Sequence, residues 1–199
     1  MTFPTYSERA LNMIVILKNV RLSFPDLWKP GTPPPNSTSG PKYGGQFIFE
    51  PGSEADLEMK KALNAVATEK WGANAATVVK ALAKDKVCLR DGDLNLTKDG
   101  SVRDGYAGMR YVVARNKLKP AIVDSNPKVT LTEESGKPYG GCYVNAKVDV
   151  YAMDKPGQGK SINATLQAVQ WVRAGEAFGS APPTADGFEE IEGEAEDLF

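Results

Sequence analysis

Basic and aromatic residues alternate in several short stretches of this chain of 199 residues. An unpaired DNA strand offers two features that do not depend on its sequence, the charged phosphates and the flat faces of the bases. Lys and Arg attract the phosphates, and aromatic rings stack on the bases with ~1–3 kcal/mol for each stacked base. The alternation therefore predicts a surface that binds single-stranded DNA. We expect its contacts to come from Arg21, Trp28, Lys29, Lys42, Tyr43, Arg103, Tyr106, Arg110, Tyr111, Arg115, Lys117, Lys137, Tyr139, Tyr143 and Lys147.

Some of the aromatic rings fit a hydrophobic core better than a binding surface. We expect core positions for Phe24, Phe47 and Phe49, and for Phe24 the alternation with Arg21 and Ser23 supports this. Tyr111 and Tyr151 fit either role about equally. Aromatic content alone therefore does not define the binding surface.

Glycine neighbours favour a functional role for three of the tyrosines. Tyr43 and Tyr139 each begin a Tyr-Gly-Gly sequence, and Tyr143 is expected to share a strand face with Lys147. Glycine beside a ring lets a backbone or a base approach closely. A bulge at the start of a strand explains the same Tyr-Gly-Gly sequences, and both explanations stay open.

Acidic residues dominate the end of the chain. Seven acids and no bases fall between Asp186 and Phe199, so the remainder carries 24 bases and 18 acids. We expect residues 180–199 to form a disordered tail that competes with a polyanion for the basic body. A simple solubility tail is the alternative, but the apolar end favours docking to a partner. The residues expected to dock are Glu194, Glu196, Asp197, Leu198 and Phe199.

The absence of histidine removes several kinds of catalysis. It excludes Ser-His-Asp and Cys-His nucleophilic sites, histidine general bases and histidine-ligated metals. Cys88 and Cys142 belong to no Cys-x-x-Cys pair and are typical of small buried apolar residues. We therefore expect a protein that is not an enzyme and that uses no metal and no cofactor.

Hydropathy predicts no membrane partner. No stretch approaches the ~20 apolar residues that a membrane span needs. The early apolar run from Met13 to Leu17 is too short for the core of a signal peptide, and it follows Glu8 and Arg9. A cytoplasmic protein is the expectation.

Two short motifs resemble ligand-binding loops without completing them. Gly157 to Ser161, GQGKS, lacks the earlier glycine of a phosphate-binding loop and precedes a strand-like pattern rather than a helix, so a basic hairpin turn is expected. Asp91 to Gly100, DGDLNLTKDG, has Leu96 where a calcium loop needs glycine. Ordinary turns explain both motifs.

Two other functions stay open as alternatives to DNA binding. Asp91, Asp93 and Asp104 are the residues on which a magnesium-dependent nuclease or resolvase would depend. An adaptor that only tethers partners through the tail would have no affinity for oligonucleotides. Incubation with DNA and magnesium, and a binding titration, separate these alternatives.

The elements that must position these residues are mostly strands. Residues 1–12 are expected to be a loose segment, and 29–42 a long Pro- and Gly-rich loop. A helix is expected from the N-cap Ser53 to Gly72 and a second helical stretch over 74–86. The expected strands are 13–24, 43–50, 87–96, 107–115, 121–124, 142–153 and 161–172.

This order of elements predicts a mainly β fold with an α insertion, in the α+β class. We expect one domain over 13–179 that contains a closed or nearly closed barrel such as an OB-fold, with the helical insertion at about 53–86. A β-sandwich stays open as an alternative. In this arrangement the tail at 180–199 lies outside the packed domain.

Several segments resemble the bacteriophage single-stranded DNA-binding proteins that have one OB-fold and an acidic tail ending in an aromatic residue. The matching segments are KYGGQFIF (42–49), GMRYVVARNKLKPAIVD (108–124), PYGGCYVNAKVDVYA (138–152), LQAVQWVRAGEAFG (166–179) and the tail to Phe199.

The resemblance implies binding of single strands in a groove, in phage DNA replication, recombination and repair. It also implies that the tail recruits replication proteins such as a polymerase or helicase, in the host cell cytoplasm during infection. We expect a monomer or a weak homodimer.

Overall fold

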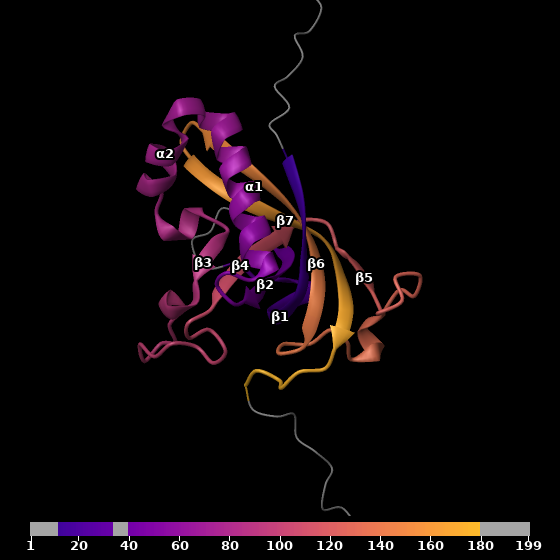
Figure 1. Cartoon of the computed structure of the whole chain (residues 1–199). Helices are drawn as coiled ribbons and strands as arrows, with labels where there is room; N and C mark the ends of the chain where they lie inside the picture. The colour runs from indigo at the N-terminus through magenta and orange to yellow at the C-terminus, as the bar shows by residue number, and fades with distance from the viewer. Residues whose placement is uncertain (1–11, 34–39, 180–199) are drawn as a thin grey trace, which may run out of the picture.

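One curved sheet of seven strands is the main element of the computed structural model, which describes residues 12–33 and 40–179 (Figure 1). Its strand order is β3-β4-β2-β1-β6-β7-β5, and only the β5–β7 pair is parallel. The strands are β1 (Asn12–Gly31), β2 (Lys42–Phe49), β3 (Leu89–Asp91), β4 (Arg110–Asn116), β5 (Ala121–Val123), β6 (Tyr143–Lys155) and β7 (Gly159–Arg173).

The sheet curls toward a barrel without completing the strand ladder. At one seam, the segment before β3 bridges β4 and β7. The Cys88 amide donates to the Ile162 carbonyl at 2.9 Å, and the Cys88 carbonyl accepts from the Val113 amide at 2.9 Å. The prediction of a mainly β fold with a helical insertion is confirmed, with an open sheet in place of a fully closed one.

The inner face of the sheet is apolar, as the alternation of β6 predicts. Val144, Ala146, Val148 and Val150 are fully buried, whereas the residues between them face outward. Each fully buried valine contributes on the order of 1.5 kcal/mol or more of hydrophobic stabilisation. The β6–β7 hairpin turns at residues 155–159, where Gln158 donates its amide to the Lys155 carbonyl at 3.1 Å. The motif at 157–161 is therefore a hairpin turn, as predicted.

The strand β1 bends twice, and each bend has a residue in the left-handed backbone region. Asn19 has φ 49° and Phe24 has φ 48°. Each lies where the register of β1 shifts, the first against β6 and the second against β2. Such bulges rotate the following side chains relative to the sheet. The predicted strand 13–24 therefore continues through these bends to Gly31.

Helix α1 (Glu54–Trp71) covers the inner face of the sheet and begins with a capping box (Figure 1). The Asp56 amide donates to the Ser53 hydroxyl at 3.4 Å, and the Asp56 carboxylate accepts from the Gly52 amide at 2.8 Å. Burial raises the pKa of Asp56, but the Gly52 hydrogen bond and the Lys60 ammonium outweigh it and hold the pKa below its ordinary value. The helix ends at Gly72, as predicted.

The segment after α1 is less regular than the sequence predicts. Helix α2 (Ala75–Ala81) stops before the predicted end at residue 86, because Leu82 is already extended. A strand over 87–96 is also wrong beyond Asp91, whose carboxylate accepts from the Asp93 amide and starts a tight turn. Single 3-10 turns follow the helices and interrupt the loops at Gly72–Asn74, Lys84–Lys86, Gly92–Leu94 and Glu133–Ser135. No helix in the described part of the chain is long and apolar enough to cross a membrane.

Candidate nucleic-acid interface

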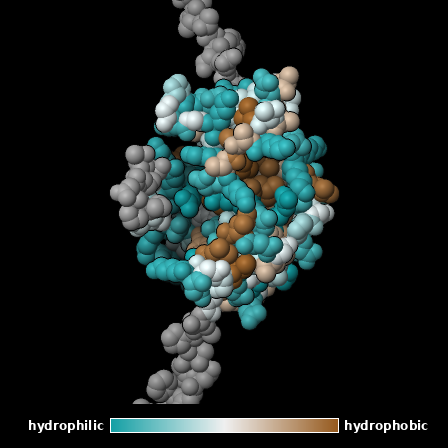
Figure 2. Space-filling view, turned by 90° about the vertical axis from the view of Figure 1, so that its left-hand side faces the viewer, coloured by the Kyte–Doolittle hydropathy of each residue, from teal (hydrophilic) through white to brown (hydrophobic). Residues whose placement is uncertain are grey.

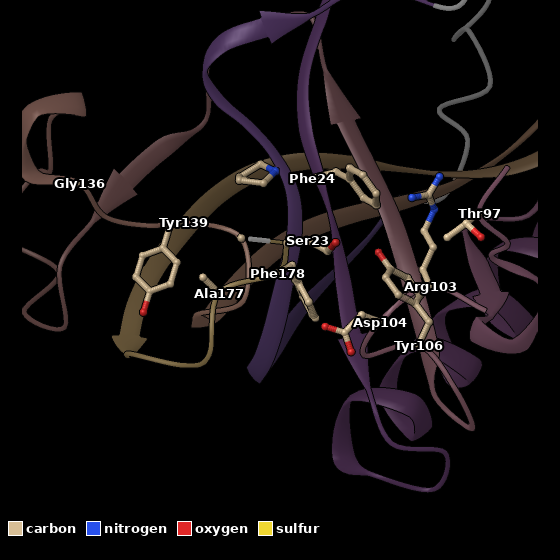
Figure 3. A pocket seen from close by; sticks show the side chains of 13 residues that line it. Ser23, Phe24, Thr97, Arg103, Asp104, Tyr106, Gly136, Tyr139, Ala177 and Phe178 are labelled. Atoms are coloured by element: carbon tan, nitrogen blue, oxygen red, sulfur yellow. The ribbon is translucent and has the colours of Figure 1, made fainter. Parts of the chain in front are cut away.

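A pocket of about 1000 Å³ lies beside the second bend of β1 (Figure 3). We call it the aromatic groove. Four separate segments form it, so the fold and not one motif creates it. Its lining residues are Ser23, Phe24, Pro25, Thr97, Arg103, Asp104, Tyr106, Gly136, Tyr139, Gly140, Ala177, Phe178 and Gly179.

Phe24 presents the most open ring in the aromatic groove. Its side chain is 48% exposed, and the Arg103 guanidinium lies 5.3 Å from the ring centroid (Figure 3). The expectation that Phe24 belongs to the core is wrong, because the left-handed backbone at this residue turns the ring out of the sheet. A bulky residue in that backbone region costs on the order of 1–3 kcal/mol, and such strain gathers at functional sites.

Arg21 and Phe178 form a second aromatic–cation pair at this groove. The Arg21 guanidinium lies 4.0 Å from the Phe178 ring centroid. Two backbone carbonyls hold it there, Gly141 at 3.2 Å from Nε and Glu176 at 2.8 Å from Nη2. The arginine is thus positioned by neutral acceptors and keeps its full positive charge. A Cβ at Gly105 would overlap the Phe178 ring, so only glycine fits there.

Tyr106 and Tyr111 support the groove from beneath and do not present free faces. Both rings are buried, pack edge to face at 5.1 Å and contact Ile48. The Tyr106 hydroxyl donates to Gln46 Oε1 at 2.6 Å, and burial raises the pKa of Tyr106 to about 12. The expectation that these two rings stack on bases is corrected accordingly, since closely packed neighbours occupy their faces.

Tyr139 lies at the opposite end of the aromatic groove and is half-buried. Its hydroxyl donates to the Gly175 carbonyl at 2.9 Å, and its ring packs at 5.7 Å against Trp171. The Lys137 ammonium lies 5.1 Å from the Trp171 ring. Tyr139 therefore anchors the segment that leads to Phe178, while Lys137 adds charge beside it.

Other predicted contacts lie on separate surfaces. Tyr143 on β6 stacks under the Arg173 guanidinium at 3.4 Å, and Lys147 is exposed further along the same strand. Trp28 is half-buried beneath the Lys119 ammonium at 4.9 Å. Lys29, next to it, forms a salt bridge of 3.1 Å with Glu133. The structure does not bring these residues together with the aromatic groove.

A smaller, polar cavity of about 290 Å³ lies on the outer face of the sheet. We call it the basic pocket, formed in part by Lys42, Gln46, Arg90, Arg115, Tyr151 and Asn163. It includes two of the predicted contacts, Lys42 and Arg115. Tyr43, the neighbour of Lys42, is half-buried opposite Asn116, and Lys117 is exposed just beyond β4.

Arg110 lies on the α2 and β3 side of the molecule, where hydrophilic residues surround an interrupted band of apolar ones (Figure 2). A pocket of about 510 Å³ there is lined by Arg110 and Tyr111 together with Leu82, Leu89 and Leu94. The Arg110 guanidinium also lies 3.8 Å from the buried carboxylate of Asp56. Arg110 therefore compensates a buried charge, which leaves it poorly placed to bind a phosphate.

The three aspartates of the nuclease alternative do not converge. The Asp91 carboxylate accepts from the Asp93 amide at 3.1 Å, and Asp93 accepts from the Gly108 amide at 2.7 Å. Asp104 lines the aromatic groove. Within residues 12–33 and 40–179, His, Cys, Asp and Glu side chains form no group of three or more that could hold a metal ion.

Sequence reasoning missed Phe24 and Phe178 as groove residues. One signal was present for Phe24, because Pro25 follows it directly and proline within a strand pattern indicates an edge or a bulge. The predicted tail contacts, Glu194 to Phe199, lie outside the described residues. Gly179, the last described residue, lines the aromatic groove.

Comparisons with known proteins identify relatives of this chain. The family model described as the ssDNA-binding protein of Enterobacter phage Enc34 matches residues 13–199. Protein p50 of Acyrthosiphon pisum secondary endosymbiont phage 1 is 37% identical over 188 residues, which cover 90% of this chain and 94% of that protein.

Two solved structures have a similar fold. The single-stranded DNA-binding protein of bacteriophage Enc34 in complex with ssDNA matches with a TM-score of 0.63 and 23% identity, over 83% of this chain and 89% of that one. The single-stranded DNA-binding protein gp2.5 of bacteriophage T7 matches with a TM-score of 0.53 and 16% identity, over 89% and 97%. These likenesses show the fold.

Proposed function

The chain belongs to the Enc34 family of phage ssDNA-binding proteins, and on that premise we propose that it binds single-stranded DNA without sequence preference in the aromatic groove. The binding role is proposed in place of catalysis. Bases stack on exposed rings, while arginines beside the rings attract the phosphates. Both interactions tolerate any base sequence, because every base has a flat face and every nucleotide a charge.

The observation that carries this proposal is the pairing of a phenylalanine ring with a cation at two places in one groove. Phe24 has Arg103 beside it, and Phe178 has Arg21 over it. A base that stacks on Phe24 brings its phosphate within the field of the Arg103 guanidinium. The strained backbone at Phe24 supports the same conclusion, since it keeps an apolar ring exposed where burial would be more stable.

The acidic tail extends the proposal to regulation and partners. It follows Gly179, which lines the groove, and carries seven acids, so it competes with DNA for the same cations. When DNA displaces it, the terminal Asp197, Leu198 and Phe199 become available to replication proteins such as a polymerase or helicase. The proposed role is in phage DNA replication, recombination and repair, in the host cytoplasm, as a monomer or weak homodimer.

The test is a fluorescence-anisotropy titration of the full chain with single- and double-stranded oligonucleotides over a range of salt. We expect single strands to bind more tightly than duplex of the same length, with a slope of log affinity against log salt of about −0.7 for each neutralised phosphate. Preference for duplex, or no binding to either, would contradict the proposal. Cleavage products that appear with magnesium and vanish with a chelator would instead support the nuclease alternative.

A further inference from the structure

Three cations from three different strands meet at the basic pocket. Lys42 begins β2, Arg90 lies on β3 and Arg115 lies on β4. In the described part of the chain none of the three forms a salt bridge. Asp85 is the one acidic residue among those that line the pocket, and Asp26 lies near enough to Arg115 for its pKa to respond to that charge. The pocket is therefore a positively charged cavity.

Arg90 is held in place before any ligand arrives. Arg90 donates from Nε to the Val87 carbonyl at 3.1 Å and from Nη2 to the Asp85 carbonyl at 2.8 Å. Arg115 pairs with Gly44 across the strands, and a Cβ at Gly44 would lie 2.8 Å from Arg115 Cγ. Glycine at this position thus lets the Arg115 side chain lie across β2. Fixing charged side chains in advance reduces the entropy lost on binding.

The basic pocket shares a wall with the aromatic groove. Gln46 lines the pocket, and its Oε1 accepts a hydrogen bond of 2.6 Å from Tyr106, which lines the groove. Gln46 also pairs across the strands with Ser23, another groove residue. Gln46 therefore connects the two sites.

The wall of the basic pocket formed by β6 and β7 suits the base or sugar of a nucleotide. Tyr151 and Asn163 face the pocket from β6 and β7, are both half-buried, and lie directly opposite each other in the strand pairing. A ring and an amide can contact a base or sugar, while the cations contact the phosphate. A volume of about 290 Å³ is near the lower end of small-ligand pockets and suits one nucleotide unit.

We propose that the basic pocket is a second subsite, which holds the phosphate of a nucleotide in the same strand whose bases stack in the aromatic groove. This inference rests on the proposed function. It assigns most of the salt dependence to the pocket and most of the stacking to the groove. The ligand of the pocket is a nucleotide phosphate. Such a phosphate occurs in a DNA strand and in a free nucleotide, and we propose the DNA strand.

The experiment compares the Lys42→Gln/Arg115→Gln variant with the unchanged chain in salt titrations on an oligo(dT). We expect the slope of log affinity against log salt to become less negative by about 1.4 in the variant, which corresponds to two lost phosphate contacts. The matched control is Lys61→Gln/Lys70→Gln, which removes two exposed lysines from α1 and should leave the slope within about 0.3 of the original. Thermal unfolding checks that each variant folds.

The possible outcomes distinguish a failure of the pocket assignment from a failure of the proposed function. If the unchanged chain binds no single strand, the proposed function fails. If it binds and the pocket variant keeps the original slope, only the pocket assignment is overturned. A third arm uses dTMP alone. Saturable dTMP binding that persists when an oligonucleotide is bound would make the pocket a free-nucleotide site and overturn the assignment to the strand.

Discussion

The aromatic groove and the basic pocket lie side by side but differ in what they offer a polynucleotide. The groove has one exposed and one half-buried phenylalanine ring, each paired with one arginine, and an acid, Asp104, in its lining. The pocket has three cations, one acid, Asp85, and one half-buried tyrosine. A base binds more strongly in the groove, and a phosphate binds more strongly in the pocket.

This difference teaches that affinity and salt dependence need not come from the same residues. Stacking is short-range and nearly independent of salt, whereas attraction to phosphates weakens steeply as salt rises. A protein that separates the two can change one without the other. Variants in each region should therefore give different signatures in the same titration.

The largest effect is expected from the groove. Replacing Phe24 with Ala removes the most open ring, which should weaken binding by about 1–3 kcal/mol, or about 5- to 150-fold in Kd. The slope against salt should stay unchanged, because no charge is lost. Anisotropy titrations at two or more salt concentrations measure both quantities.

The control for this change is Leu57→Ala, which removes a side chain that is 58% exposed on α1, away from the groove. It should bind single strands as the unchanged chain does. A Phe24→Ala protein that binds equally well would show that stacking occurs elsewhere. A changed slope would show that the two regions are not separable.

An intermediate effect is expected from the tail. A chain that ends at Ala185 loses the seven acids between Asp186 and Phe199. It should bind single strands several-fold more tightly at low salt, about fivefold, and the difference should shrink as salt rises because screening weakens the competition. The same anisotropy assay on both chain lengths checks this.

The tail comparison also distinguishes the two regions. If the tail competes mainly for charge, truncation should change the salt slope and leave the penalty of Phe24→Ala unaltered. Equal binding by the long and short chains at every salt concentration would leave no role for the tail in competition with DNA.

Regular parts of the fold were predictable from the sequence, and the irregular parts were not. The β6–β7 hairpin follows from alternation alone, because each inward residue from Val144 to Val150 is apolar and each outward one is polar or aromatic. The capping box at Ser53 likewise fixes the start of α1. In both cases neighbours in sequence decide the structure.

The site depends on contacts between distant segments, and local pattern does not encode them. Phe24 reads as a core residue because it continues an alternating pattern, yet the bulge before Asp26 turns it outward. The sequence pattern predicts a surface position for Tyr106, because basic residues flank it. In the structure Gln46 and Ile48 of β2 enclose its ring. Lys42 and Arg115 were predicted as DNA contacts. That they line one pocket with Arg90 could not be predicted, because the pairing of the strands brings the three residues together.

The smallest expected effect concerns stability and also tests why the groove ring is exposed. Replacing Phe24 with Gly should stabilise the fold by about 0.5–2 kcal/mol, because glycine adopts φ near +48° without steric cost. The same change should weaken binding of single strands as much as Phe24→Ala does. Asn19→Gly is the matched control, since Asn19 has φ 49° in the same strand and Asn tolerates this region better. It should gain less stability and leave DNA binding unaltered.

Urea unfolding gives the change in stability, and anisotropy gives the change in affinity on the same samples. A Phe24→Gly protein that is more stable and binds DNA less well would show that the strained backbone at this bend costs stability but exposes a ring that contributes to DNA binding. A less stable protein would mean that the ring stabilises the fold through its contact with Arg103. Unchanged DNA binding would show that Phe24 is not part of the interface. Stacking in the groove would then depend on Phe178, with Arg21 beside it.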